Sequence, residues 1–148
     1  MQTIFNWEKV DDSPLYTPGD LAFDAAGLVG IYLENTGAAL DAHEAAEVHE
    51  DASCRPTRVA TTAARVGVPH VDLGVGKWAW LQLYGPLAEL MVGANCAANV
   101  ALFTSATAGT LDDASSSQKK IKGIWLTTAR GSSAGTAPAF LNFPYYDL

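Results

Sequence analysis

The chain has 148 residues, of which 49% are hydrophobic and 17% charged, and its mean hydropathy is +0.08. This length and composition predict one folded domain of ordinary size and exclude a disordered chain. The formal charge of −7 is uneven, because residues 1–72 hold twelve acidic and four basic residues, whereas residues 73–148 hold four and five. Nucleic-acid binding needs clustered lysines and arginines, so we expect no nucleic-acid partner.

The sequence also argues against a membrane segment and a metal-binding cysteine set. No apolar run approaches the roughly 20 residues of a membrane-spanning helix. The first ten residues carry Asn6, Glu8 and Lys9 in place of an apolar signal core. We therefore expect a soluble protein with no membrane partner and no secretory signal. Cys54 and Cys96 are too few for structural zinc, and in a reducing compartment we expect both to be buried free thiols.

Residues 1–27 predict an extended N-terminal arm, followed by a single β-rich domain over residues 28–148. The arm mixes aromatic and apolar residues with aspartates and prolines, and its spacing fits neither a helix nor a strand. Because its aromatic side chains would be costly to leave in water, we expect the arm to pack on its own domain or on a neighbour.

The remaining elements predict a mainly β fold, a small antiparallel β-barrel or sandwich with at most one short helix. The helix is expected within residues 38–51, where Asp41 and Glu44 have the spacing of a capping box. A turn is expected at Gly85 and Pro86, between two strands of a meander. The strands are expected at residues 28–33, 59–66, 78–84, 87–92, 100–104, 121–128 and 140–143.

The strand over residues 78–84 has large apolar side chains on both faces. Trp78, Trp80 and Tyr84 share one face, and Leu81 and Leu83 lie on the other. Both faces need cover, which a domain of this size obtains most easily by forming an oligomer or docking onto a partner.

Two sequence patterns resemble catalytic motifs but lack the context that the chemistry needs. Residues 131–135 match the G-x-S-x-G pattern around Ser133, yet neither a helix nor a downstream histidine follows. The segment from His43 to Glu47 resembles a zinc-binding helix, but Glu47 stands where the second histidine belongs. A weak metal site formed by His43, Glu47 and Asp51 is left as the alternative to a solvated acidic face.

Two further patterns also fail. Residues 74–77 imitate the end of a phosphate-binding loop, but Val71 replaces the first glycine and Trp78 the Ser or Thr. Asp112 and Asp113 lie between a glycine and three serines, which predicts a solvated turn and not an acid–base pair. We therefore expect no catalytic residues, no metal and no cofactor, and a protein that is not an enzyme.

A family resemblance covers about half of the chain. Residues 78–86, 95–100, 104–113, 121–129 and 137–144 follow one another in an order that resembles the head decoration, or cement, proteins of tailed bacteriophages. The resemblance implies a structural virion protein on the capsid surface that ties adjacent subunits of the major capsid protein together. It also implies assembly in the host bacterial cytoplasm and a homotrimer or dimer.

Partly buried aromatic residues are common anchors of protein interfaces. As candidate contacts to the capsid or to a second subunit we select Ile4, Phe5, Trp7, Tyr16, Trp78, Trp80, Tyr84, Tyr145 and Tyr146. The alternatives are a tail or fibre component, and a small β-barrel module that binds a glycan or another ligand through an exposed Trp and Tyr face.

Overall fold

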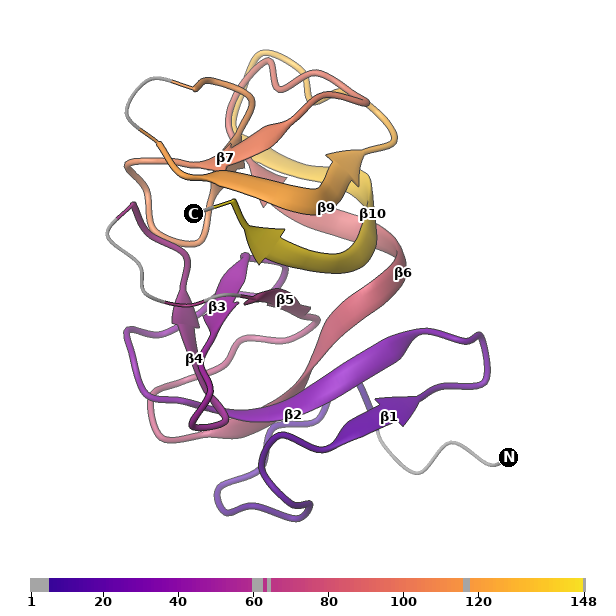
Figure 1. The fold of residues 1–148 in the computed structure, drawn as a ribbon, viewed down its shortest axis with the longest axis vertical. Coiled ribbons are helices and arrows are strands. Elements are labelled where there is room, and N and C mark those ends of the chain that lie inside the picture. Colours follow the sequence, from indigo (N-terminus) through magenta and orange to yellow (C-terminus); the bar gives the residue numbers. More distant parts are fainter. Residues whose placement is uncertain (1–5, 60–62, 64, 116–117, 148) are drawn as a thin grey trace.

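The computed structural model describes residues 6–59, 63, 65–115 and 118–147, and the described residues form strands and connecting turns without a helix (Figure 1). The strands are β1 (Leu21–Phe23), β2 (Val29–Asn35), β3 (Ala46–Val48), β4 (Ser53–Pro56), β5 (Arg65–Pro69), β6 (Trp78–Val92), β7 (Leu102–Thr104), β8 (Leu111–Asp112), β9 (Lys120–Leu126) and β10 (Gly135–Tyr146). The expected mainly β class is confirmed. Within these residues there is no helix of the length and apolar character needed to cross a membrane.

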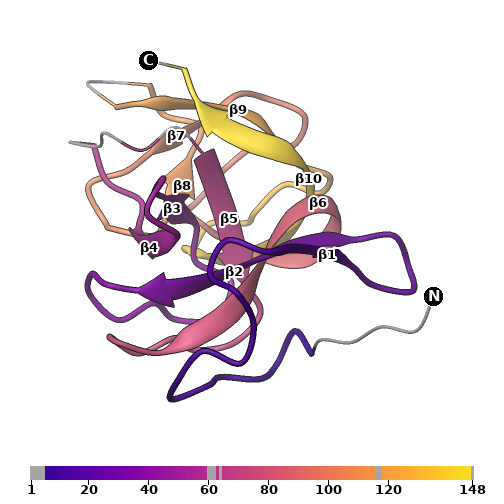
Figure 2. The ribbon, with the colours of Figure 1, turned by 60° about the horizontal axis from the view of Figure 1, so that its bottom comes forward.

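All ten strands belong to one sheet, in the order β1-β2-β4-β3-β5-β10-β6-β8-β7-β9. Additional pairings of β2 with β6, β5 with β6, and β10 with β9 curl the sheet back on itself. The sheet is mixed and not purely antiparallel, because β2 with β4 and β6 with β8 run parallel. Figure 2 shows β5 near the centre of the molecule, where it pairs with β3, β6 and β10.

The expected turn at Gly85 and Pro86 is wrong, because β6 runs through it as one strand of 15 residues. The strand bends there and changes partner, from β2 up to Tyr84 to β10 from Tyr84 onward. Gly85 takes a φ of 106°, a conformation that favours glycine. The buried side chain of Gln82 donates from Nε2 to the carbonyl oxygens of Tyr84, Gly85 and Pro86, at 3.2, 3.2 and 3.0 Å. These bonds hold the bend.

The expected helix within residues 38–51 is also wrong. The capping contact forms, since the backbone N–H of Asp41 donates to Glu44 Oε2 at 3.0 Å, but it closes a single turn. His43 has a φ of 72°, which ends any helical course. A helix would bury just Leu40 and Val48, whereas β3 is buried at all three of its positions.

Several expected strands are confirmed with shifted ends. The observed β2, β7 and β9 lie close to the predicted ranges, whereas β10 is 12 residues long and extends well beyond residues 140–143. The strand expected over residues 59–66 overlaps β5 only at Arg65 and Val66, and its residues 60–62 and 64 lie outside the described part of the chain.

Two apolar clusters form the core. The larger one lies between the strands that carry Leu90, Leu102, Leu111, Ile121, Leu126 and Leu141. The smaller one contains Ile31, Leu33, Leu40, Leu73 and Leu81. Side chains alternate along β3, so Ala46 and Val48 join the smaller cluster while Glu47 points to the opposite side.

Candidate interaction surface

The N-terminal arm packs on its own domain and covers the outer face of β2 and β6 (Figure 2). The buried rings of Tyr32 and Trp80 contact each other, with centroids 5.2 Å apart. Tyr16 from the arm packs edge-on against both, at 5.1 and 5.2 Å, and Trp78 stacks on Tyr32 at 5.8 Å. The expectation that both faces of this strand need cover is met within the chain, so this face needs no second subunit.

Polar contacts fix the arm in place. Asp11 exchanges two backbone hydrogen bonds with Trp78, at 2.9 and 3.0 Å. The Tyr32 hydroxyl donates to Asp11 Oδ2 at 2.7 Å, and burial, followed by this bond, raises the pKa of Tyr32 to about 12. Trp7 stacks on His70 with centroids 4.8 Å apart, and its Nε1–H donates to Asp24 Oδ2 at 3.0 Å. The arm's end, residues 21–23, joins the sheet as β1.

The candidate contact residues therefore have different surroundings. Ile4 and Phe5 lie outside the described residues. Trp7, Tyr16 and Trp78 are half-buried, and Trp80 is buried, all within the arm's aromatic cluster. Tyr146 is buried at the end of β10, whereas Tyr84 and Tyr145 are exposed by 36% and 46%. Of the described candidates, the most exposed rings are thus Tyr84 and Tyr145.

A second set of rings lies on the outer side of β6, β10 and β9. We call it the aromatic face and define it as Tyr84, Trp125, Phe140 and Phe143. Trp125 stacks on Phe140 at 5.3 Å, Phe140 meets Tyr84 edge-on at 5.7 Å, and Tyr84 stacks on Phe143 at 5.4 Å. Phe143 is 48% exposed. Four rings from three strands thus form one row on a partly exposed surface.

The strand register explains why these residues meet. Phe140 on β10 lies opposite Trp125 on β9 and opposite Pro86 on β6. Residues that are paired across a sheet project to the same side, so one row crosses all three strands. The sequence shows these aromatic residues, but the register depends on β10 lying between β6 and β9, which a meander does not provide.

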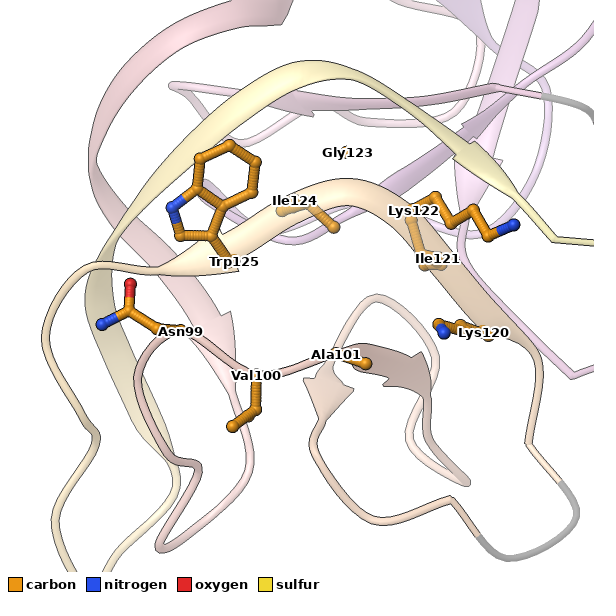
Figure 3. Close-up of a pocket in the computed structure, with 9 residues that line it drawn as sticks. All are labelled: Asn99, Val100, Ala101, Lys120, Ile121, Lys122, Gly123, Ile124 and Trp125. Atoms are coloured by element: carbon orange, nitrogen blue, oxygen red, sulfur yellow. The ribbon is translucent and has the colours of Figure 1, made fainter.

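An open groove of about 400 Å³ continues from this face between β9 and the segment that leads into β7 (Figure 3). Trp125 and Ile124 line it from β9, and Asn99 and Val100 line it from the opposite segment. The backbone of the two sides is joined at one end, where Asn99 N–H donates to Leu126 O at 2.9 Å. The groove is therefore largely apolar, with the indole of Trp125 at one end.

Two lysines stand at the other end of the groove. Lys122 Nζ lies 3.1 Å from Asp147 Oδ1, and this hydrogen bond and charge raise the pKa of the Lys122 ammonium. Lys120 also lines the groove. The lysine cluster of residues 119–122 thus lies at the start of strand β9. Its Lys120 and Lys122 place positively charged groups beside the apolar groove.

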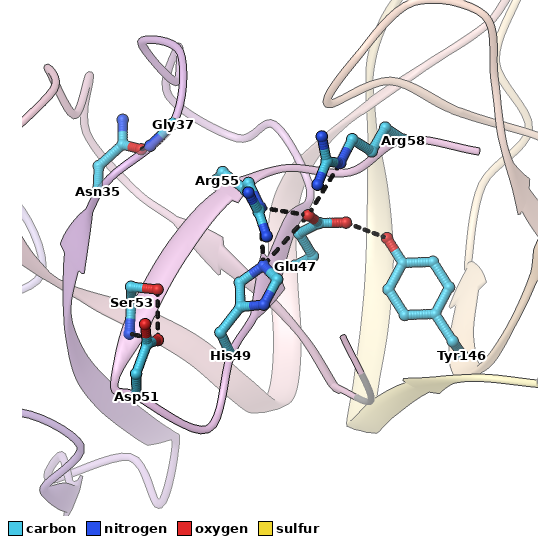
Figure 4. A network of polar contacts seen from close by, with 9 residues as sticks. All are labelled: Asn35, Gly37, Glu47, His49, Asp51, Ser53, Arg55, Arg58 and Tyr146. Atoms are coloured by element: carbon cyan, nitrogen blue, oxygen red, sulfur yellow. Dashed lines mark hydrogen bonds and ion pairs between the residues drawn. The ribbon is translucent and has the colours of Figure 1, made fainter. Parts of the chain in front are cut away.

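A buried charged network lies on the far side of β3 (Figure 4). The side chain of Glu47 is fully buried, and its Oε1 accepts from Arg55 Nε at 2.7 Å and from Arg58 Nε at 3.2 Å. His49 Nε2 lies 3.1 Å from the same oxygen, and the Tyr146 hydroxyl lies 3.5 Å from Oε2. The network links β3 and β4 to the end of β10. The solvated acidic face that the sequence predicts for Glu47 is therefore wrong, because a buried carboxylate between two arginines has no local signature.

The alternative metal site of His43, Glu47 and Asp51 does not assemble. His43 Nε2 lies 3.1 Å from Glu89 Oε2, and Glu47 is engaged by the two arginines. Asp51 Oδ1 accepts from the Ser53 hydroxyl, and this bond lowers the pKa of the Asp51 carboxyl. The three side chains thus have separate partners.

The paired aspartates differ from the expected solvated turn. Asp112 belongs to β8 and Asp113 accepts from the Ala97 N–H at 2.9 Å, and both side chains are partly buried. With Cys96 they form a group whose ligand atoms lie within 4.8 Å of one another. Burial raises the pKa of the Cys96 thiol to about 11, so without a bound cation the sulfur is protonated at neutral pH.

The other motifs have structural partners. Ser133 lies in a loop, where its carbonyl oxygen accepts from Arg130 Nε at 2.7 Å. Lys77 Nζ lies 2.6 Å from Asp12 Oδ1, at the base of the arm. Cys54 and Cys96 are buried and free, as expected.

No protein-family model and no curated protein matches the chain.

Proposed function

We propose that the protein is a non-enzymatic structural protein of a phage virion, which binds the outside of the capsid and ties adjacent major capsid subunits together. The observation that carries this proposal is the aromatic face, Tyr84, Trp125, Phe140 and Phe143, on the outer side of β6, β10 and β9. Contiguous exposed apolar surface on a small domain is typical of a protein–protein interface.

The geometry of the row suits a protein partner. Each stacked pair holds its two rings against each other, so the row is a fixed cluster of aromatic side chains. Clustered aromatic anchors of this kind supply most of the binding energy at protein interfaces. Phe143 and Tyr84, which are the more exposed members, would lose the most water-accessible surface on docking.

Two groups with catalytic potential in the described part of the chain, Glu47 and His70, are engaged in structural contacts, which favours a non-enzymatic role. Glu47 is bound by Arg55 and Arg58. His70 donates from Nε2 to Gln82 Oε1 at 2.7 Å beneath the stacked ring of Trp7, and burial lowers the pKa of its imidazole. These contacts hold strands and the arm together.

Cementing follows from mass action. A protein that binds the assembled lattice and not its dissociated subunits stabilises it by about 2.7 kcal/mol per site at a hundredfold excess over Kd. We propose that the chain does this as a homotrimer, or as a dimer, on the capsid surface of the virion.

The test is co-sedimentation of the purified protein with expanded heads of the phage that encodes it. We expect wild-type protein to bind to saturation at a fixed copy number per head. The variant Tyr84→Thr/Phe143→Asn should lose at least tenfold in affinity, because it removes two anchor rings. Asparagine suits position 143, where φ is 47°, so the fold should tolerate the change.

The matched control removes exposed apolar surface elsewhere. Leu15 and Val75 are 57% and 59% exposed and lie apart from the aromatic face. The variant Leu15→Ser/Val75→Thr should bind heads like the wild type. Failure of wild-type protein to bind, or equal binding by the aromatic variant, would contradict the proposal.

The groove beside Trp125 favours a second candidate function, a module that binds a glycan or another ligand. Its volume of about 400 Å³ is in the range of small-ligand sites. Affinity electrophoresis in gels containing host-cell polysaccharide tests it. Retardation of the wild type but not of Trp125→Ala, together with no binding to heads, would favour this candidate.

A further inference from the structure

The guanidinium groups of Arg55 and Arg58 lie side by side at the end of the buried carboxylate of Glu47 (Figure 4). Both reach the same oxygen, Oε1, through Nε, at 2.7 and 3.2 Å. Nε is the inner nitrogen of the guanidinium, so the two outer nitrogens of each arginine are left for other partners. Within the described part of the chain, these outer nitrogens make no hydrogen bond, and the two side chains are 33% and 47% exposed.

The charges in this cluster do not balance. One carboxylate faces two guanidinium groups, which stay protonated at any pH at which the protein is folded. His49, whose Nε2 lies 2.9 Å from Arg55 Nε, adds either nothing or a further positive charge. The neighbouring Asp51 is turned to Ser53, with its Oδ1 accepting from the backbone N–H and from the hydroxyl. Glu47, Arg55 and Arg58 together therefore carry a net charge of +1.

This positive charge is unusual for its part of the chain. Residues 1–72 contain twelve acidic and four basic residues, and two of those four basic residues are Arg55 and Arg58. Glu47 fixes both side chains by their inner nitrogens, so little rotamer freedom is left to lose when a ligand binds. The result is a pair of preorganised guanidinium forks that point from a buried anchor toward solvent.

We propose that Arg55 and Arg58 form a binding site for a single oxyanion, a carboxylate or phosphate group. The planar forks match the paired oxygens of such a group, and an anion between them would offset their mutual repulsion. Glu47 acts as a positioning residue, since it holds the arginines and is itself buried away from the ligand. The proposal is independent of capsid binding through the aromatic face.

The test is an NMR titration of protein labelled with ¹⁵N in its arginine side chains, at constant ionic strength made up with sodium chloride. Inorganic phosphate is the ligand in one arm and acetate in the other. We expect saturable shifts of the Arg55 and Arg58 Nε–H signals in at least one arm. Saturation with phosphate alone assigns a phosphate ligand, saturation with acetate alone assigns a carboxylate, and saturation with both assigns a general oxyanion site.

Variants separate this site from general charge attraction. Arg58→Gln should weaken binding at least about tenfold, the loss expected for one bidentate fork. Arg65→Gln removes an exposed arginine from β5, changes the net charge equally, and should leave the affinity within about twofold. Arg58→Lys keeps the charge without the fork and should also bind more weakly.

Three results would overturn the proposal. The first is no saturable shift of the wild-type Arg55 and Arg58 signals with either anion. The second is equal weakening by Arg65→Gln and Arg58→Gln. The third is a set of saturable shifts centred on other arginines. The wild-type titration decides the matter even if a variant fails to fold.

Discussion

Replacing Glu47 by glutamine should cost about 3 kcal/mol of the free energy of unfolding. The substitution keeps the size of the side chain but removes the charge that holds Arg55 and Arg58. Breaking one partner of a buried ion pair typically costs about 3–5 kcal/mol. The two guanidinium groups here are partly solvated, at 33% and 47% exposure, so the lower end of that range applies. For a domain whose total stability is about 5–15 kcal/mol, this loss is large.

Urea denaturation followed by tryptophan fluorescence measures the effect. The midpoint should fall while the dependence on urea concentration stays the same, because the surface exposed on unfolding does not change. Glu50→Gln is the control, since Glu50 is exposed three residues along the chain and should change stability by less than about 0.5 kcal/mol. A Glu47→Gln variant as stable as the Glu50→Gln variant would refute the view that this network holds β3, β4 and β10 together.

Three other predictions follow from buried or partly buried side chains. Gln82→Leu should lower the free energy of unfolding by about 2–3 kcal/mol, measured by urea denaturation, because it leaves three carbonyl oxygens at the β6 bend without their donor. Cys54 and Cys96 have thiol pKa values raised by burial to about 12 and about 11, so neither should react with a thiol reagent at pH 8 until denaturant is added; fast labelling of the native protein would contradict this. His70 has a pKa lowered by burial, so the unfolded chain binds its proton more readily and stability should fall as the pH drops below about 6.5. In His70→Gln the melting temperature should fall less between pH 7 and pH 5 than in the wild type, and an equal fall would contradict the assignment.

The β class could be predicted from the sequence because local patterns carry it. The apolar runs that became β2, β7 and β9 are each bounded by turn residues. Tertiary pairing decided the rest. Gly85 and Pro86 read as a turn, but the side chain of Gln82 satisfies the bend from within β6. Likewise the capping contact of Asp41 and Glu44 forms locally, yet β3 gains more burial by pairing with β4 and β5.

The candidate site was harder to predict because exposure depends on the whole fold. Trp78 and Trp80 look like free anchors in the sequence, and the arm covers them through Tyr16 and Trp7. Phe143 lies in the short final strand that the sequence predicts over residues 140–143, where a φ of 47° accompanies a ring that is 48% exposed. Strand order decides which of these side chains are buried and which are exposed, and no local sequence pattern encodes that order.

The most direct test of the proposed cementing role is the temperature at which phage heads release their DNA. Heads that lack the protein should release DNA at a lower temperature than complete heads, because the lattice loses its bound stabiliser. Adding back wild-type protein should restore the higher temperature, and adding Tyr84→Thr/Phe143→Asn should not. An unchanged release temperature with and without the protein would contradict the account, as would full restoration by the aromatic variant.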